Sequence, residues 1–415
     1  MGIVVVGLGD DGPAGLGERA LEVVRQAELQ SGGRRHLAFF AEHPAEKLPI
    51  TNNLDEVVAR LAAAADERRC VVLASGDPCF FGIGPVLAER LGRERVEIIP
   101  QVGSAALAFA RLGLAWQDAA VLSAHGRPLA DLLGAAVAAR KLAILTDDDS
   151  TPAAIAGALL AAGMPDCRAF VLEHLGGVAE RVVETRLAEL PGQAFARLNV
   201  LVLLPDSDGP GGLRFGRAEA EFRHARGQIT KAEARAVALA KLRPPPDGVL
   251  WDVGAGSGSL SVEAAGLMPG GKIYAVERDA EQLDCLRENV RRHLAPQVQP
   301  VAGRAPEALV GLPRPDRVFV GGGGAALGAI VQSCLERLDG RGRLVANAAT
   351  LDSVVEAQSC VQGAGWQSEL VQLAVARGRA IGGRTRLEAL NPVFILSAWP
   401  GGENGEPAGR EAAGA

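Results

Sequence analysis

Hydrophobic runs and helical periodicity alternate along the first half of the chain. Short apolar runs predict buried strands, and the segments between them repeat apolar residues every three to four positions, which predicts helices. The predicted strands are residues 3–6, 70–74, 96–99, 119–122, 142–145, 169–172 and 197–204. The predicted helices are residues 16–25, 53–65, 83–91, 105–112, 129–139 and 153–161. This alternation indicates an α/β fold with a largely parallel sheet.

A second alternation follows a boundary at PDSDGPGG, where proline, glycine and aspartate cluster. The first helix of this second alternation begins with TKAE, which predicts a capping box in which the Thr230 hydroxyl accepts from the Glu233 amide. The predicted helices are residues 230–242, 260–267 and 279–289, and the predicted strands are 249–253, 272–276, 299–301, 317–320, 344–346, 370–375 and 393–398. A polar loop, ARGRAIGGRTR, separates the last two strands. We therefore expect α/β domains over 1–204 and 228–399, a linker over 205–227 and a disordered tail over 400–415.

The strand over 249–253 ends in three glycines at alternating positions, Gly254, Gly256 and Gly258. Glycine lets the backbone turn sharply and lets a ligand approach it, and the helix behind the turn offers unpaired N–H donors. Glu277 closes the next strand about 20 residues later, where a carboxylate accepts the hydroxyls of a ribose. The pattern therefore predicts a nucleoside ligand.

Two nucleoside cofactors compete for this turn. A dinucleotide fingerprint needs a third glycine beneath the pyrophosphate, and Ser259 stands at that position. S-Adenosylmethionine is therefore favoured over a dinucleotide. A literal GxGxxG also occurs at 7–12, but its Asp10 and Asp11 would face an anionic pyrophosphate, so we do not interpret it as a dinucleotide site.

Composition narrows the function further. A formal net charge of −6, without a basic run, argues against a nucleic-acid surface. Six cysteines are scattered singly without metal-ligand spacing, which is typical of reduced thiols in a cytoplasmic protein, and no metal site is expected. Neither a signal peptide nor a membrane-spanning stretch is expected.

Three strand ends of the first half carry candidate ligand loops, because ligands of parallel sheets bind beyond the carboxyl ends of the strands. They are SGDPCFFGIG at 75–84, QVGSAA at 101–106 and TDDDSTP at 146–152. The first is either a ligand loop or an ordinary turn with an apolar plug. His125, in SAHGRP, is either a site residue or a solvated loop histidine.

Both halves resemble known methyltransferases. TKAEAR, LWDVGAGSGSLSVEAA, YAVER, GRAPEAL, FVGGGG and ARGRA resemble the class I methyltransferase domain that acts on precorrins in cobalamin biosynthesis. VVGLG, VLASGDPCFFGIG, VEIIPQVGSAALAFARLGLAWQD, HGRP and LTDDDSTPAAIA resemble the class III tetrapyrrole methylases. In this order the two halves are similar to the fused precorrin-6Y C(5,15)-methyltransferase (decarboxylating) family.

The resemblance implies methylation of precorrin-6B, the reduced form of precorrin-6Y, at carbons 5 and 15, with loss of carbon dioxide from the carbon-12 acetate to give precorrin-8X. It implies that the N-terminal domain methylates carbon 5 and that the C-terminal domain methylates carbon 15 and decarboxylates. It also implies two S-adenosylmethionine sites per chain and a homo-oligomer. The alternatives are the cobalt-precorrin version of these steps, a non-catalytic N-terminal module and a nucleic-acid methyltransferase.

The resemblance further implies cofactor contacts in each domain. In the C-terminal domain they are Thr230, Gly254, Ala255, Gly256, Ser257, Gly258, Glu277 and Ala305. In the N-terminal domain they are Gly7, Gly9, Gly76, Asp77, Pro78, Phe81, Ser104 and Ala105. The sequence departs from the family at Arg304, where many relatives carry Asp, and at residues 10–13, where relatives tend to have Pro and Gly.

Methyl transfer to an electron-rich carbon needs orientation more than a strong base. The glycines at 321–324 form either a floor for the macrocycle or a tightly packed turn. Arginines in the polar loop are either ligands for substrate carboxylates or solvated charges; they are Arg377, Arg379, Arg384 and Arg386. Asn347 and Asn391 are candidates to bond a pyrrole or a carboxylate.

Overall fold

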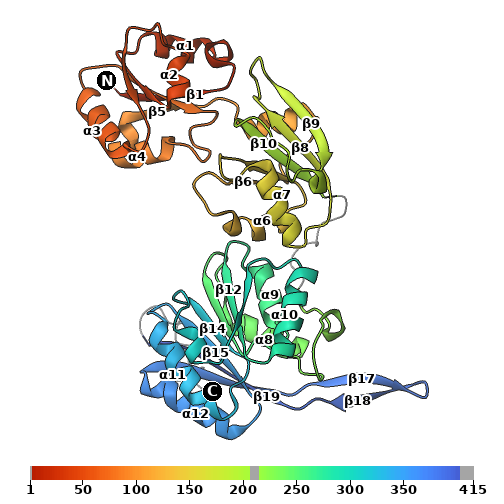
Figure 1. Cartoon of the computed structure of the whole chain (residues 1–415). Helices are drawn as coiled ribbons and strands as arrows, with labels where there is room; N and C mark the ends of the chain where they lie inside the picture. The colour runs from red at the N-terminus through yellow and green to blue at the C-terminus, as the bar shows by residue number, and fades with distance from the viewer. Residues whose placement is uncertain (1, 206–214, 402–415) are drawn as a thin grey trace, which may run out of the picture. The chain divides into compact units, whose positions relative to one another are not determined.

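The computed structural model describes residues 2–205 and 215–401, and the chain forms two compact α/β units (Figure 1). The first unit holds two five-stranded sheets and the second holds a seven-stranded sheet and a separate two-stranded hairpin. Within the described ranges, no helix is both long and apolar enough to cross a membrane.

The first sheet of the first unit has the order β3-β2-β4-β1-β5, with every neighbouring pair parallel. Its strands are β1 (Ile3–Leu8), β2 (Leu29–Gly32), β3 (Glu46–Pro49), β4 (Cys70–Ser75) and β5 (Val96–Ile99). Alternate residues of β1 face opposite sides, so Val5 packs in one core cluster and Val6 in another. The sequence misses β2 and β3 because LQSG and EKLP are short and partly polar.

The second sheet of this unit has the order β6-β7-β10-β8-β9. Its strands are β6 (Ala120–Ser123), β7 (Leu142–Leu145), β8 (Arg168–Glu173), β9 (Arg181–Arg186) and β10 (Asn199–Leu204). Only β6 and β7 are parallel, because β10 runs antiparallel to both β7 and β8, and β9 runs antiparallel to β8. The expectation of a largely parallel sheet is therefore confirmed for the first sheet of this half and wrong for the second, since an apolar run carries no information about strand direction.

The helices of the first half begin and end within a few residues of their predicted bounds. They are α1 (Glu18–Arg25), α2 (Arg34–Ala38), α3 (Leu54–Ala64), α4 (Gly84–Leu91), α5 (Ser104–Leu112), α6 (Leu133–Ala138) and α7 (Pro152–Ala161). The short helix α2 was not predicted, because RRHLA is too brief for a periodic pattern.

The second unit is built on the sheet β13-β12-β11-β14-β15-β19-β16. Its strands are β11 (Val249–Val253), β12 (Lys272–Glu277), β13 (Val298–Ala302), β14 (Arg317–Val320), β15 (Arg343–Ala348), β16 (Trp366–Leu373) and β19 (Val393–Pro400). The five strands from β13 to β15 are parallel, and β19 and β16 complete the edge in antiparallel pairs. The strand order reverses between β11 and β14, which is where open α/β sheets bind ligands.

Helices cover both faces of this sheet. They are α8 (Ala232–Leu242), α9 (Ser259–Leu267), α10 (Ala280–Arg292), α11 (Leu327–Arg337) and α12 (Leu351–Gly363). Leu250 packs with residues of α8, α9 and α10, whereas its neighbour Trp251 packs with residues of α11 and α12. The sheet residues are therefore buried on both sides, which explains the continuous apolar strands in the sequence.

Two segments differ from their predicted form. The expected polar loop is a hairpin, β17 (Ala376–Ile381) and β18 (Arg384–Ala389), which extends beyond the main sheet (Figure 1). The expected linker over 205–227 is too long, because Phe222 is buried in the core of the second unit and the Arg223 amide bonds Asn289. Part of that linker (206–214) and most of the expected tail (402–415) lie outside the described residues.

Candidate functional sites

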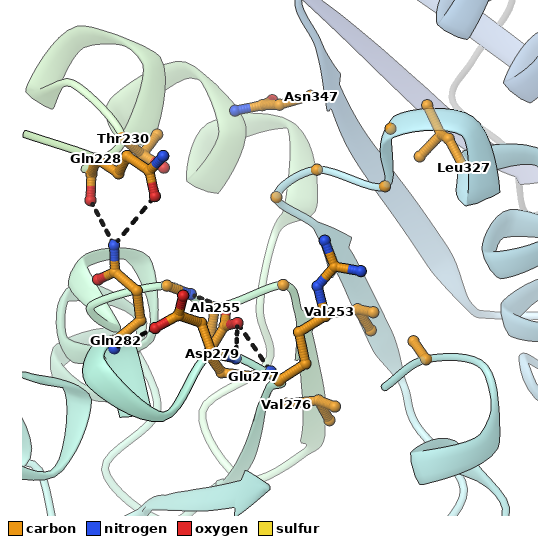
Figure 2. Close-up of a pocket in the computed structure, with 18 of the residues that line it drawn as sticks. Gln228, Thr230, Val253, Ala255, Val276, Glu277, Asp279, Gln282, Leu327 and Asn347 are labelled. Atoms are coloured by element: carbon orange, nitrogen blue, oxygen red, sulfur yellow. Dashed lines mark hydrogen bonds between the residues drawn. The ribbon is translucent and has the colours of Figure 1, made fainter. Parts of the chain in front are cut away.

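A cavity of about 830 Å³ lies at the carboxyl ends of β11, β12, β14 and β15 (Figure 2). Of the predicted cofactor contacts in this half, seven line it: Thr230, Gly254, Ala255, Gly256, Ser257, Glu277 and Ala305. The four glycines at 321–324 and Asn347 also line it, so the structure brings the strand-end candidates together. Gly258 does not line the cavity.

The three alternating glycines have different surroundings, although all have positive φ. A Cβ on Gly256 would meet no atom within 4 Å. A Cβ on Gly258 would lie 2.1 Å from Leu286 Cδ1, and one on Gly254 would lie 3.0 Å from the Gly322 oxygen. Gly256 therefore leaves space for a ligand, whereas Gly258 permits close packing of α9 on α10.

Glu277 is fixed by backbone donors at the wall of this cavity. Its Oε2 accepts from the Gly256 amide at 2.8 Å, and its Oε1 accepts from the Arg278 and Asp279 amides, each at 2.8 Å. Asp279 in turn caps α10 by accepting from two amides of its first turn. The carboxylate is thus held in one orientation, with lone pairs remaining for further donors, as ribose recognition requires.

The Thr230 segment is held by a buried arginine. Arg235 and Glu263 form an ion pair in which both side chains are fully buried, with Nη2 and Oε1 2.9 Å apart. Arg235 also donates to the carbonyl oxygens of Thr230 and Arg217. The predicted capping box is wrong, because Lys231 is the N-cap of α8 and no side chain caps it.

Arg377 is neither of the two predicted alternatives, a free ligand for substrate carboxylates or a solvated charge, because it is paired within the protein. Its guanidinium donates to both carboxylate oxygens of Glu219 and to both of Glu233. Its hydrogen bonds hold the pKa of Glu219 at about 2, and the pKa of Arg377 is raised in turn. Glu233 is thus paired with the hairpin instead of the helix cap, since a bidentate guanidinium is the stronger partner.

The other hairpin candidates also lie away from the cavity. Arg379 pairs with Glu388 across the hairpin at 3.2 Å, and Arg384 and Arg386 are exposed. Asn391 is exposed and does not line the cavity, so its assignment to this site is not supported by its position.

Two buried polar side chains belong to the strands that end at the first cavity: Asn347 lines the cavity and Asp252 does not. Asn347 is 8% exposed, and its Oδ1 has no hydrogen-bond partner among the residues that the structure describes. Asp252 is fully buried on β11, and burial raises the pKa of its carboxyl to about 7, against the lowering effect of the Ser261 hydroxyl. Asn347 is the candidate of the two that faces the cavity.

Sequence reasoning missed other residues of this cavity. They include Arg226, Gln228, Gln282, Thr350 and Ser353. Gln282 Nε2 lies 3.5 Å from Gln228 Oε1, whereas Gln282 Oε1 is buried without a partner among the described atoms (Figure 2). Single glutamines on a helix or in an irregular segment carry no motif, so no signal in the chain would have identified them.

A second cavity, of about 520 Å³, lies in the first unit between residues of its two sheets. The predicted residues that line it are Gly9, Gly76, Asp77, Phe81 and Ser104. Gly7, Pro78 and Ala105 do not line it. A Cβ on Gly7 would lie 2.0 Å from the Gly76 oxygen, so Gly7 allows two strand-end loops to approach each other.

Asp10 connects both parts of this unit. It accepts from Arg35 Nη1 at 2.6 Å and lies 3.0 Å from His174 Nδ1. His36, beside Arg35, is buried, and burial together with the Arg35 charge lowers its pKa to about 4. Asp10 departs from the family pattern, but in the structure its carboxylate is paired with Arg35 and His174. The sequence does not reveal this pairing, because Arg35 and His174 are far apart in the chain.

Two family matches together cover most of the chain. Residues 2–191 match the family described as Tetrapyrrole (Corrin/Porphyrin) Methylases. Residues 220–399 match the family described as Precorrin methyltransferase domain. The first cavity lies within the second matched region, and the second cavity lies in the first matched region except for residues 198–200 of its lining.

Relatives of known name are similar to one or both parts. A Sinorhizobium protein named precorrin-6Y C(5,15)-methyltransferase [decarboxylating] is 37% identical over 94% of this chain and 94% of its own length. A Pyrobaculum calidifontis protein named probable cobalt-precorrin-6B C(15)-methyltransferase (decarboxylating) is 46% identical over 43% of this chain and 92% of its own. The solved structure of precorrin-6Y C5,15-methyltransferase from Geobacter metallireducens GS-15 is 42% identical, with a TM-score of 0.43, over 45% of this chain and 97% of that one.

Proposed function

Because the chain belongs to the precorrin-6Y C(5,15)-methyltransferase (decarboxylating) family, we propose that it methylates precorrin-6B at carbons 5 and 15 with S-adenosylmethionine. In the same sequence of steps it removes carbon dioxide from the carbon-12 acetate, which gives precorrin-8X in cobalamin biosynthesis. The observation that carries the proposal is the pair of strand-end cavities, one in each matched region of a chain that aligns over 94% of its length.

The residues of the C-terminal cavity fit S-adenosylmethionine. Gly256 has no neighbour within 4 Å of a Cβ position, which leaves room for a nucleoside against the backbone. Glu277 accepts from three amides and keeps capacity for the ribose hydroxyls. Bound there, the cofactor supplies an electrophilic methyl group on its sulfonium sulfur.

The protein groups act mainly by orientation. The Glu277 carboxylate fixes the ribose end, and the four glycines at 321–324 leave the end of β14 without side chains, where a flat ring fits. A conjugated ring carbon of the substrate is already nucleophilic, so residues that hold the two reactants in position would replace the strong base that other transfers need.

Asn347 is the candidate group for the decarboxylation. Its amide is 8% exposed at the end of β15 and lines the cavity, where the Nδ2 hydrogens are the donors that a substrate carboxylate would accept. A neutral amide holds a carboxylate in orientation without the strong attraction of a guanidinium. This favours loss of carbon dioxide, because the negative charge leaves the carboxylate and enters the conjugated ring.

We propose that the work is divided between the two domains, with carbon 5 assigned to residues 1–204 and carbon 15 and the decarboxylation to residues 228–399. The Pyrobaculum relative supports this division, because its name covers only the C(15) step and the match is 181 residues long. In the N-terminal cavity, Gly9, Gly76, Asp77 and Ser104 are the candidate cofactor contacts. A cytoplasmic location stays a prediction, as does a homo-oligomer, which sedimentation of the purified chain would check.

Mass spectrometry of the product tests the proposal. Full-length protein is incubated with S-adenosylmethionine and precorrin-6B, and we expect the gain of two methyl groups with loss of one carbon dioxide. The cobalt form of the substrate is run in parallel, and turnover of that form alone would favour the cobalt alternative. No methyl gain on either macrocycle would contradict the proposal.

Calorimetry with S-adenosylhomocysteine counts the cofactor sites. We expect two sites per chain in the wild type and one in Glu277→Ala, because that change removes the carboxylate that is placed for the ribose. Asp284→Ala is the matched control, since this carboxylate lies on α10 and pairs with Arg287 at 3.0 Å outside the cavity. A single site in the wild type would contradict the two-site proposal.

A further inference from the structure

Phe81 has a backbone conformation that its own packing does not explain. Its φ is +53°, in the left-handed region, which bulky side chains rarely adopt. The loop is fixed by local bonds, because the Asp77 side chain accepts from the Cys79 amide at 2.8 Å and the Gly84 amide donates to the Pro78 carbonyl at 2.9 Å. Strain of this kind is concentrated at ligand sites.

The side chain of Phe81 is also exposed. It is 52% exposed and Phe80 is 41% exposed, and their ring centroids lie 4.8 Å apart in an edge-to-face arrangement. Both residues line the N-terminal cavity. A single exposed hydrophobic residue is ordinary, but an exposed aromatic pair at a cavity, with a strained backbone at Phe81, indicates a surface for an apolar, flat ligand.

An arginine from a different part of the chain meets this pair. The Arg127 Cζ lies 6.0 Å from the centroid of the Phe81 ring. Arg127 follows β6 in the HGRP segment, two residues after His125, which lines the cavity. Arg127 itself is outside the lining and lies beside it, over the Phe81 ring. Throughout 2–205 and 215–401, Arg127 has no carboxylate partner, so its guanidinium is free for an anionic ligand.

We propose that Phe80, Phe81 and Arg127 form the rim that binds the macrocycle at the N-terminal cavity. The phenylalanine rings lie against the flat conjugated face, and the Arg127 guanidinium pairs with a carboxylate on the edge of the ring. The inference rests on the proposed function, in which this domain methylates a polycarboxylated tetrapyrrole. It moves Phe81 from the predicted cofactor contacts to the substrate contacts.

Phe81→Gly separates the fold from the function at this position. Glycine adopts positive φ without strain, so the unfolding temperature of the variant should not fall. The KM of the macrocycle for carbon-5 methylation should rise about tenfold, which is typical of the loss of one good aromatic contact. The KM of S-adenosylmethionine should not change.

Arg127→Gln tests the charged part of the rim. We expect a further rise of about tenfold in the macrocycle KM, because a charge-assisted hydrogen bond is replaced by a neutral one. Arg93→Gln is the matched control, since Arg93 is an exposed arginine of the same unit that neither lines the cavity nor lies over the Phe81 ring. A change in the S-adenosylmethionine KM instead, or no change in either KM, would overturn the proposal.

Direct binding distinguishes a failure of the rim from a failure of the proposed function. The wild type and the double variant Phe81→Gly, Arg127→Gln are titrated with precorrin-6B by calorimetry, without S-adenosylmethionine. Loss of one binding event in the double variant supports the rim even if carbon 5 is never methylated, which would contradict the proposed function alone. Equal binding by both proteins would overturn the rim.

Discussion

Replacement of Arg235 by methionine tests whether a buried ion pair maintains the C-terminal cavity. Arg235 and Glu263 are both fully buried, and Arg235 Nη2 and Nε lie 2.9 and 3.1 Å from the same Glu263 oxygen. Methionine fills similar volume but leaves the Glu263 charge without its cation. Removing one partner of a buried pair costs about 3–5 kcal/mol, so the free energy of unfolding of the second unit should fall by that amount.

The same change should also loosen the cavity. Arg235 donates to the Thr230 carbonyl, and Thr230 lines the cavity. We therefore expect the KM of S-adenosylmethionine for carbon-15 methylation to rise in Arg235→Met, while the KM for carbon-5 methylation stays unchanged.

Calorimetric unfolding of the full chain measures the stability part of this prediction. The matched variant is Arg235→Met with Glu263→Gln, in which the neutral amide still accepts from the Arg217 amide that lies 3.0 Å from Glu263. The double variant should be about 1–3 kcal/mol more stable than Arg235→Met alone, because no unpaired charge remains buried. A loss below about 1 kcal/mol in the single variant would refute the reasoning, since that is the range of exposed pairs.

Two further predictions concern the glycine turn and the strand before it. Gly256→Ala should weaken S-adenosylhomocysteine binding in calorimetry and should cost about 1–2 kcal/mol of stability, because its φ is positive. Gly258→Ala should lower the unfolding temperature further, because its φ is also positive and its Cβ would lie 2.1 Å from Leu286 Cδ1; equal losses of stability in the two variants would contradict this assignment. Burial raises the pKa of Asp252 from its ordinary value of 3.8 to about 7. The folded chain therefore keeps a proton that the unfolded chain loses, and stability should fall as the pH rises from about 4 to about 7. Asp252→Asn should remove that fall in denaturation curves measured across this window, and an unchanged pH dependence would exclude Asp252 as its source.

The glycine turn is the part of the site that sequence predicts well. The predicted strand over 249–253 has the observed bounds, and Glu277 ends the next strand as expected. Both follow from local rules, because a buried parallel strand is an apolar run and the turn after it needs glycine. The prediction is less accurate at Gly258, because spacing does not tell which glycine faces the ligand and which faces a neighbouring helix.

The hairpin β17–β18 shows what local patterns leave out. Its residues are mostly exposed and polar, so periodicity predicts a loop, and its arginines resemble ligands for an anionic substrate. Arg377 instead pairs with Glu219 and Glu233, which precede it by 158 and 144 positions. A pairing over that distance depends on how the sheet places β19 and α8, and no spacing rule in the chain contains that information.

Asp10, in the first unit, is a second residue whose partners local spacing does not predict. Its pairing also changes the interpretation of an acidic residue at this turn. From the sequence, acidic residues in the first turn suggest a site that has lost its ligand. In the structure the Asp10 carboxylate has a guanidinium on one side and the His174 ring on the other, and its side chain is 16% exposed. A carboxylate with two cationic or donor partners presents little negative charge to a ligand, because its neighbours compensate it. The acidic residue Asp10 is therefore compatible with a cofactor in the adjacent cavity.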